Sequence, residues 1–277
     1  MSLTTKISGV LSADEVSALK SKYDNALDRD DYVKYVFLPA LVPTIYAIIC
    51  TYSWWLALLS FALGALYGFK VVLPAIIQED YYYNSMVERD SFCINMTQIL
   101  TDPSRTLNSA IERATSRAKG ELKKDLMTLQ ANTTGASKEQ VVASFKELRN
   151  KYHEDIAFTQ YIEQLETIYL QGKIDLEPLK DISKQHQDIM KKQYQYQEDK
   201  DIAWKGVKRM LYISYALLLV IEMSFGFKVS YEAFCRSIVG WITSAIYVSI
   251  ILSNLNSFRK NYFNTSIMSI KMKAKSK

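Results

Sequence analysis

Residues 36–69 read "VFLPALVPTIYAIICTYSWWLALLSFALGALYGF", and this stretch decides the fold class of the chain. No charged side chain occurs from Tyr35 through Phe69. One crossing of a lipid bilayer takes about 20 apolar residues, so the stretch is too long for a single crossing. It predicts two crossings joined by a turn near Trp54 and Trp55, whose indole rings suit a membrane interface.

A buried helix pair in a soluble core is the alternative interpretation of this stretch. Burying so long an uncharged segment requires a larger soluble domain than a chain of 277 residues offers. The membrane interpretation is therefore favoured. It is not visible in the overall composition, because a charged fraction of 23% is ordinary for a globular protein.

A second apolar block runs from Met210 to Phe258 and predicts two further crossings, near residues 208–227 and 236–257. The segment from Ser237 to Phe258 carries no charge. At about 1.5 Å per residue it extends roughly 33 Å, which is enough for the hydrocarbon core. The chain is therefore predicted to cross the membrane four times.

The distribution of lysine and arginine predicts the orientation. The tail after Ser257 contains only basic charges, and Lys205, Lys208 and Arg209 precede the third crossing, whereas the turn between the first two crossings is uncharged. The positive-inside rule then places both termini and the middle segment in the cytoplasm. The polar residues 1–34 contain no apolar core of a cleaved signal peptide.

The middle segment predicts a cytoplasmic bundle of about six amphipathic helices. Apolar residues recur at helical spacing, glycines fall where helices should end, and Asp102-Pro103 and Ser137 through Gln140 resemble helix starts. After Asp175 no strong helix breaker occurs before Gly206, so the sixth helix is predicted to continue into the third crossing. A solvated helical spacer is the alternative for that junction.

The predicted fold class is therefore an all-α integral membrane protein with two transmembrane hairpins flanking the bundle. The segments are a cytoplasmic N-terminal segment (1–34), the first transmembrane hairpin (35–78), the cytoplasmic helical bundle (79–205), the second transmembrane hairpin (206–258) and a basic cytoplasmic tail (259–277).

The sequence contains no pattern typical of an enzyme. It lacks the G-x-x-x-x-G-K-[ST] phosphate loop, and its two histidines, His153 and His186, are far apart. His186 lies on an apolar helical stripe, which favours a hydrogen-bonded core histidine over a metal ligand. The three cysteines form no C-x-x-C pair. We therefore expect no catalytic residue, cofactor or metal.

The net charge of +5 is best explained by membrane topology. No aromatic-interleaved basic stripe is present, so no nucleic-acid partner is expected. The basic tail beside the membrane is expected to set topology, and contact with anionic lipid of the bilayer is a second role for it.

Two features inside the apolar blocks are candidate functional positions. Glu222 lies in the predicted third crossing, where an acid is costly and is often functional or paired. The alternative is that Glu222 reaches water near the outer interface. Gly64 and Gly68 have the small-xxx-small spacing that allows close helix approach, either within one chain or in a dimer.

The order of crossings and bundle resembles the platform proteins of the type II secretion F family, and most of all the tight-adherence subgroup. The stretch that carries the resemblance, residues 120–183, reads "GELKKDLMTLQANTTGASKEQVVASFKELRNKYHEDIAFTQYIEQLETIYLQGKIDLEPLKDIS". It is similar to the family's alternation of apolar helices and glycine turns. One departure is the "TDPSRTL" at 101–107, where the family usually has a glycine-containing turn.

The resemblance implies a non-enzymatic platform in the plasma or inner membrane of a bacterial or archaeal cell. On it a type IV pilus-like or pseudopilus filament of a secretion, adherence or conjugation machine would be assembled. A cytoplasmic ATPase would engage the bundle, pilin-like subunits would be handled in the membrane, and the platform would pair with itself or with a sister platform protein. Charged residues expected on faces that could contact the ATPase are Lys119, Glu121, Lys123, Lys124, Lys138, Lys146 and Arg149.

Two other classes of protein remain open from the sequence. A small transporter or channel could use four crossings, although no ion filter or inverted repeat is evident. A membrane sensor or scaffold would also use a cytoplasmic helical region, with a signalling partner in place of the ATPase.

Overall fold

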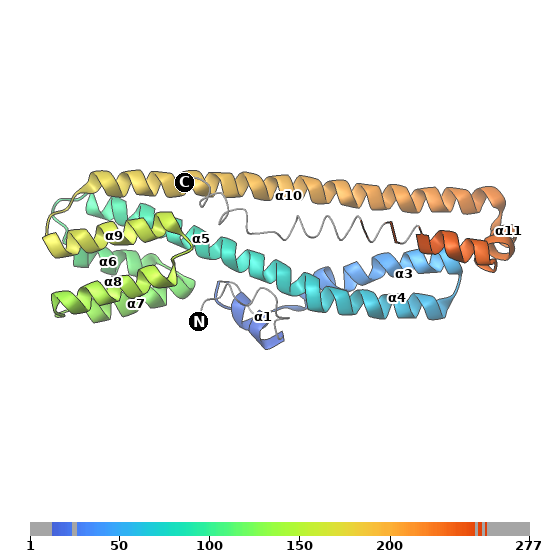
Figure 1. The fold of residues 1–277 in the computed structure, drawn as a ribbon, viewed down its shortest axis with the longest axis horizontal. Helices are drawn as coiled ribbons and strands as arrows, with labels where there is room; N and C mark the ends of the chain where they lie inside the picture. Colours follow the sequence, from blue (N-terminus) through green and yellow to red (C-terminus); the bar gives the residue numbers. More distant parts are fainter. Residues whose placement is uncertain (1–12, 24–26, 247–248, 251–252, 254–277) are drawn as a thin grey trace. The chain divides into compact units, whose positions relative to one another are not determined.

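The computed structural model describes residues 13–23, 27–246, 249–250 and 253, and all regular elements among them are helical (Figure 1). The chain divides into two compact units. We call residues 1–79 and 198–277 the terminal unit, and residues 80–197 the central unit. Two helices, α5 (Leu73–Leu100) and α10 (Leu176–Phe225), each contribute residues to both units.

Among the described residues, two helices are long and apolar enough to cross a membrane, judged by length and composition. The first, Arg29–Thr51, consists of α2 (Arg29–Tyr32), the π-helical turn η2 (Val33–Phe37) and α3 (Leu38–Thr51). The second, Trp54–Leu100, consists of α4 (Trp54–Tyr67), the π-helical turn η3 (Gly68–Val72) and α5. They correspond to the two crossings expected from residues 36–69.

Helices α3 and α4 are joined by two residues and pack against each other. The connection is tight because Tyr52 adopts the left-handed conformation, with φ of 46°, and ends α3. Ser53 returns to extended backbone before α4 begins. Trp54 and Trp55 follow directly, with stacked rings 4.0 Å apart, so the turn lies where the sequence predicted it.

Gly64 and Gly68 allow the close approach of these two helices within one chain. A Cβ added at Gly64 would lie 2.8 Å from the Cα of Ala40, and a Cβ added at Gly68 would lie 2.9 Å from the carbonyl oxygen of Tyr35. Neither distance is tolerable against backbone atoms. This close approach occurs within the chain, and the second expected role, in a dimer, stays a prediction.

Substituting either glycine with alanine is expected to destabilise the terminal unit by about 1–3 kcal/mol, because the added methyl group forces the helices apart. Gly206→Ala is the matched control, since a Cβ at Gly206 meets no atom within 4 Å. We expect that control to be neutral or slightly stabilising. The melting temperature of the detergent-solubilised chain measures the difference. Equal melting temperatures for Gly68→Ala and Gly206→Ala would contradict the close approach.

The second apolar block is described in part. Helix α10 ends at Phe225, Gly226 follows with φ of 76°, and α11 (Phe227–Ser230) and η4 (Tyr231–Cys235) come next. The chain is helical again over 238–246. Much of the expected fourth crossing, 236–257, and all of the basic tail, 259–277, lie outside the described residues. The third and fourth crossings therefore stay predictions.

The N-terminal segment contains a short helix, α1 (Ala13–Lys20), which packs on the terminal unit. Val16 is buried with Leu73 and Ile77 at the start of α5. An ion pair between Lys20 and Asp31 joins α1 to α2. Residues 1–12 and 24–26 of the predicted segment 1–34 lie outside the described residues.

The central unit contains the end of α5, then α6 (Leu107–Arg117), α7 (Gly120–Thr133), α8 (Lys138–Lys151), α9 (Ile156–Gln171) and the start of α10. Successive helices from α6 to α9 pack against each other (Figure 1). One hydrophobic core unites their apolar stripes with those of α5 and α10; its largest fully buried members are Tyr161, Phe145, Phe158, Met96, Leu100 and Leu122.

Most predicted helix ends in this unit are confirmed. Ser137 and Gln140 form a reciprocal capping box at the start of α8, and Gly172 ends α9 with φ of 68°. The predicted start at Asp102-Pro103 is wrong. The Asp102 carboxylate accepts hydrogen bonds from the backbone N–H and hydroxyl of Ser104 and so stabilises a turn, and Thr106 caps α6 instead.

Helix α10 is continuous for 50 residues, which confirms that the sixth bundle helix runs on into the second apolar block. At about 1.5 Å per residue it is roughly 75 Å long. Helix α5 likewise passes the predicted boundary at 78/79 without a break. Just past this boundary, Tyr81 is buried in the central unit, where its hydroxyl donates to Glu121.

Candidate functional site

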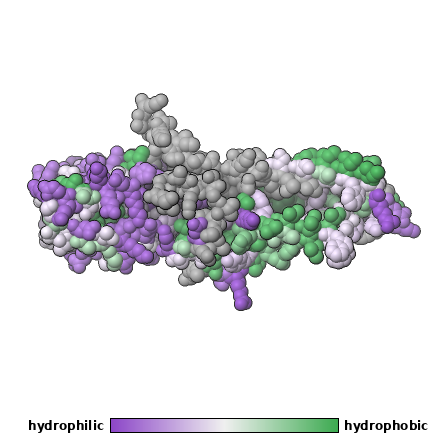
Figure 2. All heavy atoms as spheres, turned by 60° about the horizontal axis from the view of Figure 1, so that its bottom comes forward, coloured by the Kyte–Doolittle hydropathy of each residue, from purple (hydrophilic) through white to green (hydrophobic). Residues whose placement is uncertain are grey.

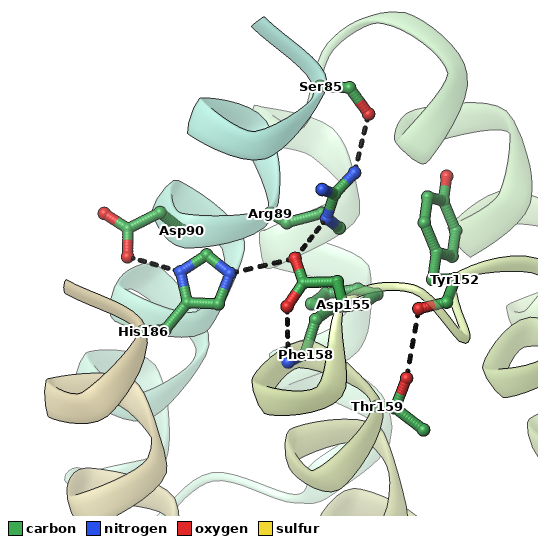
Figure 3. Close-up of polar contacts among 8 residues, drawn as sticks. All are labelled: Ser85, Arg89, Asp90, Tyr152, Asp155, Phe158, Thr159 and His186. Carbon is green, nitrogen blue, oxygen red and sulfur yellow. Dashed lines mark hydrogen bonds and ion pairs between the residues drawn. The ribbon is translucent and has the colours of Figure 1, made fainter. Parts of the chain in front are cut away.

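A buried group of polar and charged side chains lies in the central unit where α5, α9 and α10 meet (Figure 3). We call Ser85, Arg89, Asp90, Asp155 and His186 the His186 cluster. His186 is fully buried, and its Nδ1 and Nε2 atoms lie 2.9 Å from Asp90 and 3.2 Å from Asp155. The prediction of a hydrogen-bonded core histidine is confirmed.

Each member of the His186 cluster is placed by its helix. Ser85, Arg89 and Asp90 lie on α5, where the spacing of four residues lets Arg89 donate to the Ser85 hydroxyl at 2.7 Å. Asp155 is the N-cap of α9 and accepts from the backbone N–H of Phe158 at 3.1 Å. Its second oxygen accepts from Arg89 at 2.7 Å as well as from His186. One carboxylate therefore joins three helices.

Ion pairing keeps both His186 and Asp155 in their charged forms at neutral pH. Burial alone would disfavour a charged histidine, but the hydrogen bonds and charges of Asp155 and Asp90 raise the pKa of His186 from 6.5 to about 9. Burial opposes ionisation of Asp155 too, yet the hydrogen bond from His186 and the charge of Arg89 hold the pKa of Asp155 well below its usual value. At neutral pH, both ring nitrogens of His186 therefore donate to carboxylates.

The arrangement is suited to holding helices together. His186 has both ring nitrogens engaged, and the rings of Tyr152 and Phe158 lie within 6 Å of the Arg89 guanidinium. Among the described residues, no group of histidine, cysteine and acidic side chains is arranged to hold a metal ion. We therefore interpret the His186 cluster as a structural connection between α10 and its neighbours.

A second buried polar contact joins α5 to α9 about two turns further along. The Tyr161 hydroxyl lies 2.8 Å from the Thr97 hydroxyl and donates to the carbonyl of Cys93 at 3.1 Å. All three residues are buried. Together with the Arg89–Asp155 ion pair, this contact fixes α9 along α5 by directional bonds as well as by apolar packing.

Glu222 is half-buried in the terminal unit and is hydrogen-bonded to the Tyr52 hydroxyl. Tyr52 is the residue with positive φ at the α3–α4 turn, so this bond connects α10 to the end of the first apolar pair. The Cys235 thiol donates to the carbonyl of Cys50 beside it at 3.2 Å. Because Tyr52 lies at the turn, this contact is compatible with both interpretations of Glu222, and its functional role stays a prediction.

The seven charged residues expected to face an ATPase fall into two groups. Lys119, Lys124, Lys138 and Lys146 are exposed and Lys123 is half-buried. Glu121 instead pairs with Lys151 at 2.9 Å and accepts from Tyr81, while Arg149 pairs with Glu166 at 3.0 Å. Glu121 and Arg149 are thus engaged in contacts within the bundle, because the α7–α8 and α8–α9 contacts bring opposite charges together.

Sequence reasoning singled out His186 but missed its partners. Asp155 carried a local signal, because an aspartate directly before an apolar-periodic segment is a typical N-cap. Arg89 and Asp90 carried none, since adjacent charges on a helix are usually solvated. Only the packing of α5 against α9 and α10 identifies them.

A protein of Bacillus anthracis, described as uncharacterized, is 40% identical to the chain over 267 residues, covering 96% of each. The chain belongs to the family of this protein. Because the similarity extends over nearly the whole length of both, we expect the terminal and central units to be features of the family. No family model matches the chain, and no solved structure matches it.

Proposed function

We propose that this family member is a non-enzymatic platform in the plasma or inner membrane of a bacterium, on which a type IV pilus-like or pseudopilus filament is assembled. The observation that carries the proposal is the contrast between the units. The terminal unit exposes large apolar side chains, whereas the central unit buries its apolar stripes and exposes charges (Figure 2).

The apolar surface supports the membrane part of the proposal. Trp55 is 66% exposed, Tyr212 73%, Met223 81% and Ile238 80%. Exposed apolar surface of this extent needs a partner, and a lipid bilayer is the partner that fits helices of 23 and 47 residues with high hydropathy. In this proposal α3, α4, the end of α10 and the helix after Arg236 form two transmembrane hairpins.

The continuous helices support a coupling role. In the proposed arrangement a cytoplasmic ATPase contacts the central unit, and α5 and α10 transmit its movement to the membrane, where pilin-like subunits are handled. Lys119, Lys124, Lys138 and Lys146 are the exposed members of the predicted set, and Lys124, Lys138 and Lys146 are chosen for the test. Because Gly64 and Gly68 pack within the chain, a homodimer or a sister platform protein would use another surface.

The test is quantitative mass spectrometry of what co-purifies with the tagged chain from native membranes in mild detergent. We expect a secretion-type ATPase and pilin-like subunits. The triple variant Lys124→Glu, Lys138→Glu, Lys146→Glu should lose the ATPase. The matched control, Lys184→Glu, Lys191→Glu, Lys192→Glu, reverses as many exposed charges on α10 and should keep it.

Recovery of the intact chain without either class of partner, under conditions in which the filament is made, would overturn the platform. A signalling protein recovered in their place would favour a membrane sensor or scaffold.

A further inference from the structure

Five basic residues of the terminal unit lie at nearly the same height along the axes of its helices. The ion pair between Lys200 of α10 and Glu79 of α5 fixes the register of these two antiparallel helices, with an Nζ to Oε1 distance of 2.5 Å. Lys70 and Arg209 each lie nine residues from that pair, on the side of the exposed apolar surface. At about 1.5 Å per residue both are roughly 14 Å from it.

The first helix brings a third segment to the same level. Gly68 lies against the backbone of Tyr35 and Val36, which places Lys34 beside η3 and near Lys70. The Tyr215 hydroxyl donates to the carbonyl of Val42, and these residues lie six and seven positions beyond Arg209 and Tyr35. The registers of α10 against α5 and against α3 therefore agree. We call Lys34, Lys70, Lys205, Lys208 and Arg209 the basic belt.

The basic belt carries an excess of positive charge, with Asp31 close enough to interact with the charge of Lys34. All five side chains are exposed, and within the described part of the chain none pairs with a carboxylate. The sequence contains no acid from Tyr32 through Gln78 or from Ile202 through Ile221. Lys208 lies over the ring of Trp204 at 5.5 Å and Lys34 over that of Tyr35 at 5.1 Å.

The basic belt also lies at the boundary between an apolar and an acidic part of the surface. On one side of it, α3, α4 and the end of α10 expose leucine, isoleucine and aromatic side chains. On the other side α10 carries Glu198, Asp199 and Asp201, all exposed. Cations between an apolar surface and an acidic one match the layer where lipid phosphates meet water, and lysine stems and aromatic rings suit that layer.

We propose that the basic belt binds the phosphate groups of anionic phospholipids in the cytoplasmic leaflet. The inference rests on the membrane placement proposed above. The occupant is a bilayer lipid because the belt adjoins the exposed apolar surface, which acyl chains cover while the phosphate meets the lysines. Bound lipid would contact η2, η3 and α10 together and so stabilise the terminal unit.

The experiment uses the full chain in mild detergent with phosphatidylglycerol or phosphatidylcholine of equal chain length. The belt variant changes all five residues to glutamine. The control variant changes Lys138, Lys146, Lys184, Lys191 and Lys192, which are exposed in the central unit, to glutamine. Both lose the same charge. Native mass spectrometry counts bound lipids, and the melting temperature reports stabilisation.

We expect phosphatidylglycerol to bind the unmodified chain and the control variant at least tenfold more tightly than phosphatidylcholine, and to raise their melting temperatures. The belt variant should lose that preference while melting normally in phosphatidylcholine. The double variant Lys208→Gln, Arg209→Gln should lose part of it, which provides a milder test if five changes impair folding. Equal preference in the belt and control variants would overturn the proposal.

Carbonate extraction of membranes separates this proposal from the function on which it rests. If the unmodified chain stays in the membrane and the belt variant keeps its phosphatidylglycerol preference, only the proposal that the basic belt binds lipid is wrong. If carbonate releases the unmodified chain, the membrane placement is overturned and the belt with it.

Discussion

Asp155→Ala is expected to destabilise the central unit by about 3–5 kcal/mol, because it leaves two buried cations without their shared anion. Arg89 and His186 both bond to the same oxygen of Asp155, and its other oxygen caps α9. Loss of the cap alone costs about 1 kcal/mol. The larger part of the effect therefore comes from the ion pairs, and α9 and the first turns of α10 should open together.

Hydrogen exchange of the full chain in detergent, read by mass spectrometry, locates and measures this effect. Protection should fall in α9 and in the part of α10 around His186. Asp155→Asn keeps an N-cap acceptor and should lose less. Asp188→Ala removes an exposed carboxylate from α10 and is the matched control. Equal protection in Asp155→Ala and Asp188→Ala would show that Asp155 does not hold the bundle together.

The second large effect is a loss of stability of the central unit at alkaline pH. His186 holds its proton up to a pKa of about 9 in the folded chain, against 6.5 for an ordinary histidine. Below pH 6.5 His186 is protonated in both the folded and the unfolded chain, and its contribution to the stability of the folded chain is complete. It is lost as pH rises from 6.5 through 9, by about 3 kcal/mol in all.

Asp155 acts in the opposite direction at acidic pH. Its pKa is lowered in the folded chain, so its contribution is present above the ordinary value of 3.8 and is lost as pH falls below that value. The charged groups that face His186 are Asp90 on α5 and Asp155 at the start of α9, with Arg89 beside Asp155. The central unit should therefore be most stable between about pH 4 and 6.5.

Chemical denaturation of the full chain at pH 6 and pH 9, followed by hydrogen exchange in the central unit, measures the alkaline part. His186→Asn should be less stable at pH 6 and should lose most of the difference between the two pH values. A His153→Asn variant is the control, because His153 is exposed and its Nδ1 lies 2.9 Å from the carbonyl of Asn150 rather than near a carboxylate of the His186 cluster. A pH dependence that persists in His186→Asn would assign it to other groups.

Local patterns were sufficient for much of the fold. Apolar residues at helical spacing identified the stripes of α6 through α10, because one face of each helix is buried. Gly135 and Gly172 adopt positive φ at helix ends, as their sequence positions indicated. The error at Asp102-Pro103 is also local: the Asp102 side chain can cap a turn as well as a helix, and sequence alone does not distinguish the two.

The sequence by itself determined which segments are apolar, which are helical and where most helices begin and end, because these properties depend on residues a few positions apart. The tertiary structure alone decided which distant charges meet. His186 finds Asp90 and Asp155 in other helices, Glu222 finds Tyr52, and Lys34, Lys70 and Arg209 reach one level only through the register of three helices. The reason is physical: helix periodicity is a local property, whereas ion pairs and shared surfaces depend on how separate helices pack.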